Sequence, residues 1–168
     1  MTGPTLTPLP LTAERFAPFG DVIGVSQDTR EPMNEARFER FNDLAQLNID
    51  THADGHTAIS IARCRMPTKL PHSFDLIERH PLGSQAFIPL NGQRFVVVVA
   101  PAGESADIEE LRAFVTNGHQ GINYHRGVWH MPLIALEANQ EFLIVDRAGE
   151  GMNCEELVLP ERVTLVAP

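Results

Sequence analysis

The fold is decided by the stretch Glu78-Arg79-His80-Pro81-Leu82-Gly83-Ser84-Gln85-Ala86-Phe87-Ile88-Pro89-Leu90-Asn91-Gly92. Side chains alternate between the two faces of a strand, so Glu78 and His80, two residues apart, point to the same face. Gln85 opens the next apolar run. The Asn-Gly pair that follows lies between two apolar runs and predicts a hairpin with a type I′ turn, because Gly and Asn accept positive φ there. The stretch therefore predicts consecutive β-strands that carry polar side chains near one turn.

Short apolar runs with turn signals continue on both sides of this stretch. Strands are predicted at 19–25, 37–44, 57–64, 74–78, 85–89, 94–100, 112–116, 132–136, 142–146 and 163–166. Two short helices are predicted, at 11–16 with Thr12 as N-cap and at 107–111. Short strands with turns every 8–12 residues are typical of a sandwich or barrel. No repeat or boundary interrupts the chain, so we expect one domain over residues 1–168 with a mainly β fold.

The run Phe95-Val96-Val97-Val98-Val99 is apolar at every position rather than at alternate ones. A strand of this kind is expected to be buried on both faces, by other strands or by a second subunit. The second possibility motivates the prediction of a homodimer.

Composition excludes several classes of protein. The formal net charge is −9 and the pI about 5.2, with Lys69 as the only lysine, so no basic footprint for nucleic acid is present. Cys64 and Cys154 are far apart and predict free thiols rather than a disulfide framework or a thiolate metal site. No apolar run approaches membrane-spanning length, and the first residues lack the features of a secretory signal. We therefore expect a cytoplasmic protein that binds neither nucleic acid nor membrane.

A second polar segment runs from His125 to His130. The two segments resemble the paired motifs of the cupin family. Glu78 and His80 occupy the two histidine positions of the first motif and Gln85 its glutamate position. His130 occupies the histidine position of the second motif. The resemblance implies a double-stranded β-helix barrel of the jelly-roll type, with a metal site at Glu78, His80, Gln85 and His130. Two histidines and one carboxylate can still hold a divalent metal, although an amide binds it more weakly than a carboxylate. A pocket without metal stays an open alternative.

Longer stretches identify a more specific relationship. Residues 78–90, 111–118, 121–130 and 142–147 resemble the signature of the ureidoglycolate lyase family, whereas residues 26–56 match it least. The resemblance implies a carbon–nitrogen lyase of the amidine-lyase type that releases urea from ureidoglycolate and leaves glyoxylate, in allantoin breakdown within purine metabolism. It also implies a homodimer and a divalent metal, with nickel as the ion.

The chemistry of such a reaction requires a base for the substrate hydroxyl, stabilisation of the developing alkoxide and an acid for the leaving nitrogen. The predicted catalytic residues are His125, Tyr124 and Glu78. The predicted substrate-binding residues, chosen to hold a carboxylate, are Arg63, Lys69 and Arg126. His125 is the first candidate for acid–base work, although the sequence does not separate base from acid, and packing against the barrel mouth is favoured over proton donation for Tyr124.

Other functions remain open at this point. A hydrolase that releases ammonia from the same substrate is one alternative, and a metal-dependent isomerase or dioxygenase acting on a small acid is another. A cupin that binds a small acid without catalysis is the third. The enantiomer of the substrate, the identity of the metal and the fold of residues 26–56 are not determined by the sequence.

Overall fold

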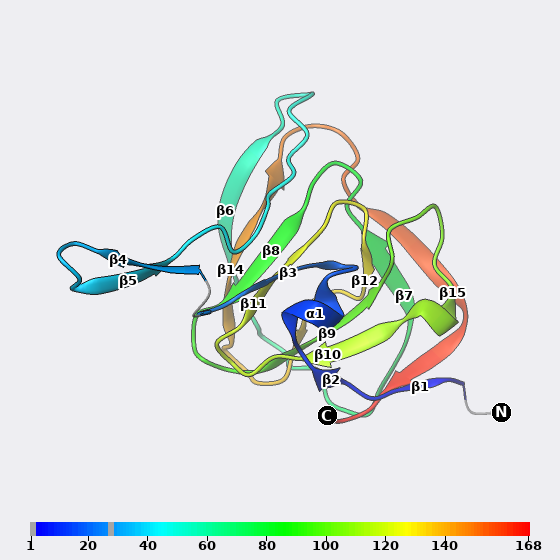
Figure 1. The fold of residues 1–168 in the computed structure, drawn as a ribbon. Helices are drawn as coiled ribbons and strands as arrows, with labels where there is room; N and C mark the ends of the chain where they lie inside the picture. Colours follow the sequence, from blue (N-terminus) through cyan, green and yellow to red (C-terminus); the bar gives the residue numbers. More distant parts are fainter. Residues whose placement is uncertain (1–2, 27–28) are drawn as a thin grey trace.

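A computed structural model describes residues 3–26 and 29–168, so the chain's first two residues and two positions of the polar stretch 26–56 lie outside the description. Strands dominate, and they curl into a barrel (Figure 1). The helical elements described are α1 (Ala13–Phe16) and the 3₁₀ turn η2 (Ile108–Glu110). Across the described ranges, no helix has the length and apolar character needed to cross a membrane. The mainly β, cupin-like fold predicted from the sequence is confirmed.

Two sheets form the barrel. The larger has the order β1-β15-β7-β12-β9-β10-β2, with β13 also paired to β9. Its strands are β1 (Thr5–Leu6), β2 (Leu9–Pro10), β7 (His72–Arg79), β9 (Phe95–Ala100), β10 (Arg112–Val115), β12 (Trp129–His130), β13 (Ile134–Ala135) and β15 (Glu155–Leu165). The smaller has the order β3-β11-β8-β14-β6. Its strands are β3 (Gly20–Ile23), β6 (His56–Arg63), β8 (Gln85–Pro89), β11 (Gly121–Tyr124) and β14 (Glu141–Ala148).

Strand β9 is buried at all six of its positions, as its apolar run predicted. Phe95, Val97 and Val99 belong to the core between the two sheets. Val96, Val98 and Ala100 belong to a second core, enclosed by the curl of the larger sheet. Elements of the same chain therefore cover both faces of β9, and this strand no longer argues for a second subunit.

The predicted Asn-Gly hairpin is wrong. Strand β8 lies in the smaller sheet and β9 in the larger, so Asn91 and Gly92 carry the chain from one sheet to the other. Gly92 has φ +68°, but Asn91 does not have the positive φ that a type I′ turn requires. The next crossing, at Gly118, packs against the first: a Cβ on Gly118 would lie 2.5 Å from the carbonyl oxygen of Gly92. Close approach of two crossings, rather than strand pairing, explains the glycines here.

The stretch that the sequence left open contains a hairpin and a strap. The hairpin is formed by β4 (Arg30–Met33) and β5 (Phe38–Phe41), which pair only with each other among the described strands and project away from the barrel (Figure 1). Residues 42–55 then cross the outside of the smaller sheet. Buried Arg147 holds this strap by donating to the carbonyl oxygens of Asp50 and His52.

Candidate functional site

Three of the predicted metal ligands meet at one end of the core between the two sheets. The ligand atoms of Glu78, His80 and His130 all lie within 4.8 Å of one another. Glu78 on β7 and His130 on β12 are direct register partners in an antiparallel pair, so their side chains emerge on the same face. His80 follows the last residue of β7. The structure therefore brings Glu78, His80 and His130 close together, as their positions in the two sequence segments predicted.

Backbone carbonyls fix the orientation of both histidines. His130 Nδ1 lies 3.0 Å from the carbonyl oxygen of Val128, and His80 Nδ1 lies 2.6 Å from that of Asn153. A carbonyl oxygen only accepts, so each Nδ1 carries the proton and donates it. The Nε2 atoms are the ones that face the cluster. His130 Nε2 is buried without a hydrogen-bond partner, 3.6 Å from Glu78 Oε1.

Gln85, at the start of β8, adds a fourth group from the opposite sheet. Its Nε2 donates to Asp146 Oδ2 at 3.1 Å, and its Oε1 lies 3.0 Å from His80 Nε2. With the proton of His80 on Nδ1, this second contact joins two acceptors. The cluster thus presents carboxylate, amide and imidazole lone pairs to one point, with no donor among them.

This donor set fits a divalent metal. Acceptors without protons between them repel one another unless a cation or an additional proton lies at their centre. Two ligands bound at right angles, each about 2.1 Å from a metal, lie about 3 Å apart, which matches the His80–Gln85 separation. Imidazole bonded at its other nitrogen to a carbonyl is also the usual arrangement of a metal-binding histidine. A metal ion at the centre of the cluster would also give the buried Nε2 of His130 a partner.

The charges around the cluster favour an ionised Glu78. When the cluster holds a proton instead of a cation, that proton lies on the His130 ring, whose hydrogen bond is the largest cause that lowers the pKa of Glu78, against the opposing effect of burial. Tyr124 on β11 stacks on His130 with ring centroids 4.3 Å apart. Burial, and then the negative charge of Glu78, raise the pKa of Tyr124, so its phenol keeps its proton and has it available to donate.

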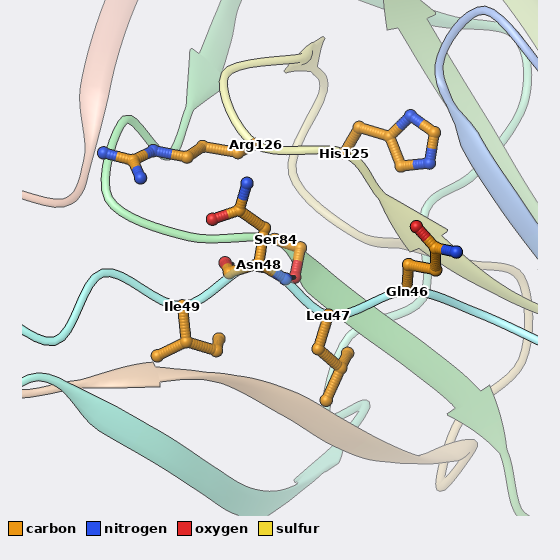
Figure 2. Close-up of a pocket in the computed structure, with 7 residues that line it drawn as sticks. All are labelled: Gln46, Leu47, Asn48, Ile49, Ser84, His125 and Arg126. Atoms are coloured by element: carbon orange, nitrogen blue, oxygen red, sulfur yellow. Dashed lines mark hydrogen bonds between the residues drawn. The ribbon is translucent and has the colours of Figure 1, made fainter.

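Two depressions are lined by neighbours of the cluster residues, although none of the four residues themselves lines either depression. One, of about 610 Å³, is lined by residues that include Trp129, Met152 and Cys154. The thiol of Cys154, which lines this depression, contacts Glu78 Oε2 at 3.5 Å, but Glu78 itself is not among the lining residues. The other, of about 530 Å³, is polar and is lined by residues that include Asn48, Ser84, His125 and Arg126 (Figure 2). It lies on the far side of the turn that carries His80 and Gln85.

His125 occupies this second depression rather than the cluster. Along β11, Ile122 and Tyr124 point into the core, so Asn123 and the following His125 point outward. His125 Nε2 lies 3.2 Å from Asp21 Oδ1. The structure therefore separates the predicted catalytic residues into Glu78 and Tyr124 inside the barrel and His125 outside it.

The three predicted carboxylate-binding residues do not meet. Arg63, at the end of β6, pairs with Glu141 on the neighbouring strand. Lys69 is exposed in the connection between β6 and β7. Arg126 donates to the carbonyl oxygen of Pro81, next to His80, and to Asp50. Only Arg126 touches the turn that forms the cluster.

Sequence reasoning missed the role of Asp146. From the sequence, an ion pair of Asp146 with Arg147 or Arg112 is as good an expectation as a catalytic role, but in the structure Arg147 holds the strap and Arg112 donates to the carbonyl oxygens of Glu109 and Leu111. Alternation along β14 places Phe142 in the core, so Asp146, four residues on, faces inward as well. That periodicity was the available signal.

Comparison with known proteins shows which family this chain resembles over nearly its whole length. The family model described as ureidoglycolate lyase matches residues 3–166. The ureidoglycolate lyase of Pseudomonas fluorescens (strain Pf0-1) is 49% identical over 96% of this chain and 96% of the relative. That of Pseudomonas savastanoi pv. phaseolicola (strain 1448A / Race 6) is 48% identical over 94% of this chain and 91% of the relative. That of Burkholderia mallei (strain NCTC 10229) is 47% identical, over 96% and 93%. Every strand that carries the cluster lies within the matched residues.

Proposed function

This chain belongs to the ureidoglycolate lyase family, and from that premise we infer that it eliminates urea from ureidoglycolate to give glyoxylate. The observation that carries the assignment to a site is the convergence of Glu78, His80, Gln85 and His130 between the two sheets. The segments that supply these residues are also those with the family signature. We propose this cluster as the place of reaction.

The substrate carries a hydroxyl, a carboxylate and a ureido nitrogen on one carbon. Elimination removes the hydroxyl proton, forms the aldehyde C=O bond and breaks the C–N bond, whose electron pair leaves with the nitrogen. A proton delivered to that nitrogen completes urea. A divalent metal held by Glu78, His80, Gln85 and His130, with nickel as the proposed ion, would lower the pKa of the hydroxyl as a Lewis acid.

Glu78 is the proposed base. A cation beside the carboxylate favours its ionised form, and its two oxygens face different surroundings. Oε1 faces His130, whereas Oε2 faces the Cys154 thiol. One carboxylate can therefore contribute Oε1 to the cluster and accept the substrate proton at Oε2.

Tyr124 is the proposed proton donor to the leaving nitrogen. Its phenol is held protonated by burial, and the nitrogen of a departing urea anion is far more basic than a phenolate, so transfer in this direction is downhill. Glu78, protonated in the first step, can then restore the phenol proton. We assign acid–base work to this pair rather than to His125, because His125 faces the outside of the barrel beside Asp21.

Of the three basic residues predicted to hold the substrate carboxylate, Arg126 is the one that we retain for an effect on substrate binding, exerted through the turn after His80 because Arg126 lies on the far side of that turn from the cluster. It braces Pro81, directly after His80, and it lines the polar depression. Arg63 and Lys69 lie at other positions, in an ion pair with Glu141 and on an exposed connection. Steady-state kinetics of Arg126→Ala and Arg63→Ala compare the two arginines in substrate binding. We expect Arg126→Ala to raise KM and Arg63→Ala to leave it unchanged.

The decisive assay for the reaction measures three products separately from one incubation with racemic ureidoglycolate. A lyase forms one urea for each glyoxylate and no ammonia. Two ammonia molecules for each glyoxylate would instead indicate the hydrolase alternative, and no turnover would indicate a binding role. Exhaustive chelation followed by addition of Ni²⁺ tests the metal, because activity that survives chelation unchanged contradicts it.

We further propose that the chain forms one cupin-like domain over residues 1–168 and acts as a cytoplasmic homodimer. The termini support a single unit, since β1 pairs with β15 and β2 with β10. The β4–β5 hairpin supports a partner copy, because an isolated two-stranded hairpin is marginal in water and this one pairs with no other described strand. Ile59 and Ile61 on edge strand β6 are also exposed, at 72% and 65%.

Light scattering tests the dimer. We expect twice the chain mass for the wild type at micromolar concentration and a shift toward the monomer for the Ile59→Glu/Ile61→Glu variant. A monomeric wild type contradicts the proposal. Fractionation of cells that express the chain tests the cytoplasmic location.

A further inference from the structure

The amide of Gln85 has two ends of nearly equal size and opposite character. Its oxygen can accept or bind a cation, whereas its NH₂ group only donates. Either end could face the cluster if the side chain were free to turn over. What selects the oxygen is the neighbour on the other side: Asp146 Oδ2, 3.1 Å from Gln85 Nε2. A carboxylate only accepts, so it holds the NH₂ end and turns Oε1 toward His80 Nε2.

The same geometry explains why an amide stands at position 85. Gln85 and Asp146 are adjacent across the β8–β14 ladder, next to the register pair Ala86–Val145. A glutamate at position 85 would bring two carboxylates about 3 Å apart, which disfavours ionisation of both. The pair Gln85–Asp146 carries one negative charge in total, as a single glutamate would. That charge lies one hydrogen bond further from the cluster.

We propose that Asp146 is a positioning residue, which sets the amide of Gln85 so that its oxygen and not its nitrogen faces the metal-binding cluster. This inference rests on the proposed function of the cluster as a metal site. It gives a role to a carboxylate that touches none of the other cluster residues. It also makes the effect of a substitution at position 146 dependent on the residue at position 85.

The experiment is a double-mutant cycle on Ni²⁺ affinity, measured by isothermal titration calorimetry on the metal-stripped protein. The variants are Asp146→Asn, Gln85→Glu and the double variant, with Glu141→Gln as the control. Glu141 is a carboxylate on the same strand, but it pairs with Arg63. In Asp146→Asn, the new amide can offer either its oxygen or its NH₂ group to Gln85, so the orientation of Gln85 is no longer fixed. We expect this variant to weaken Ni²⁺ binding by about tenfold or more.

In the Gln85→Glu background, Asp146→Asn is no longer expected to weaken Ni²⁺ binding. The carboxylate introduced at position 85 has two equivalent oxygens and needs no orientation, and Asp146→Asn then removes the repulsion between two neighbouring carboxylates. We expect the double variant to bind Ni²⁺ at least as tightly as Gln85→Glu alone, and Glu141→Gln to match the wild type. Circular dichroism checks that each variant is folded; if Asp146→Asn does not fold, the comparison of Gln85→Glu with the double variant still decides.

Two failures are distinguishable. A wild type that does not bind Ni²⁺ overturns the proposed metal site and the role of Asp146 together. A wild type that binds Ni²⁺, with Asp146→Asn equal to it or with the same weakening in both backgrounds, overturns the positioning role alone. Equal weakening is what a merely structural contribution of Asp146 produces.

Discussion

Replacing Glu78 with glutamine removes the only carboxylate among the three clustered ligand residues while keeping the shape of the side chain. Both histidines of the cluster have Nδ1 donating to a backbone carbonyl and Nε2 directed at the cluster. Because Nδ1 of each ring is bonded to a carbonyl and Nε2 is assigned to the metal, neither histidine is free to take the substrate proton. We therefore assign the whole rate contribution of the general base to Glu78 Oε2. General-base catalysis is worth about 10²–10⁴ in rate, or about 3–5 kcal/mol of transition-state stabilisation. We expect kcat for Glu78→Gln to fall by that factor.

The assay is glyoxylate release under saturating substrate, with Glu161→Gln as the control. Glu161 is an exposed carboxylate further along β15 and lines neither depression, so its substitution tests the general effect of one lost charge. We expect Glu161→Gln to keep wild-type turnover. A Glu78→Gln enzyme within about threefold of the wild type, with Ni²⁺ bound, refutes the role of Glu78 as base.

Three further predictions follow from neighbouring contacts. Tyr124→Phe keeps the ring stacked on the histidine and loses only the hydroxyl, so kcat should fall about a hundredfold in steady-state kinetics while the melting temperature stays close to that of the wild type. Because the Cys154 thiol contacts Glu78 at the edge of the depression, Cys154→Trp should lower kcat/KM at least about tenfold and Cys154→Ala should not; equal activity of the two would show that substrate does not pass this way. The pKa of Asp50 is lowered from its ordinary value of 3.8, chiefly by the backbone N–H of His52, so its ionised form stabilises the fold above that pH and the effect is lost as the pH falls through the lower folded value. Melting curves of Asp50→Asn and wild type should therefore differ at pH 7 and converge below pH 3.8, and a gap that persists in acid contradicts the assignment.

The fold was accessible from the sequence because its strands leave local signals. Thr12 caps α1 by accepting from the backbone N–H of Arg15, as the capping pattern predicted, and β8 spans 85–89 as expected. The pairing of strands was not accessible in the same way. Asn91-Gly92 has the composition of a hairpin turn, but whether the chain returns to its own sheet depends on what packs against β9, which is a non-local property.

The candidate site shows the same difference between local signals, which the sequence reveals, and non-local contacts, which it does not. Glu78 and His80 were found from their spacing, and His130 from a motif, because these signals lie within a few residues. Asp146 was missed since its partner Gln85 is 61 residues away, across the β8–β14 ladder. The outward direction of His125 was missed because β11 itself was not predicted, and without a strand there is no alternation from which to assign its face.

The most direct test of the proposed site is a crystal structure of the Ni²⁺-loaded protein with glyoxylate soaked into it. We predict that Ni²⁺ is bound by Glu78, His80, Gln85 and His130, with the aldehyde oxygen of glyoxylate at the cluster within reach of Glu78 Oε2. Glyoxylate bound in the polar depression beside His125, with the cluster free of both metal and product, contradicts it.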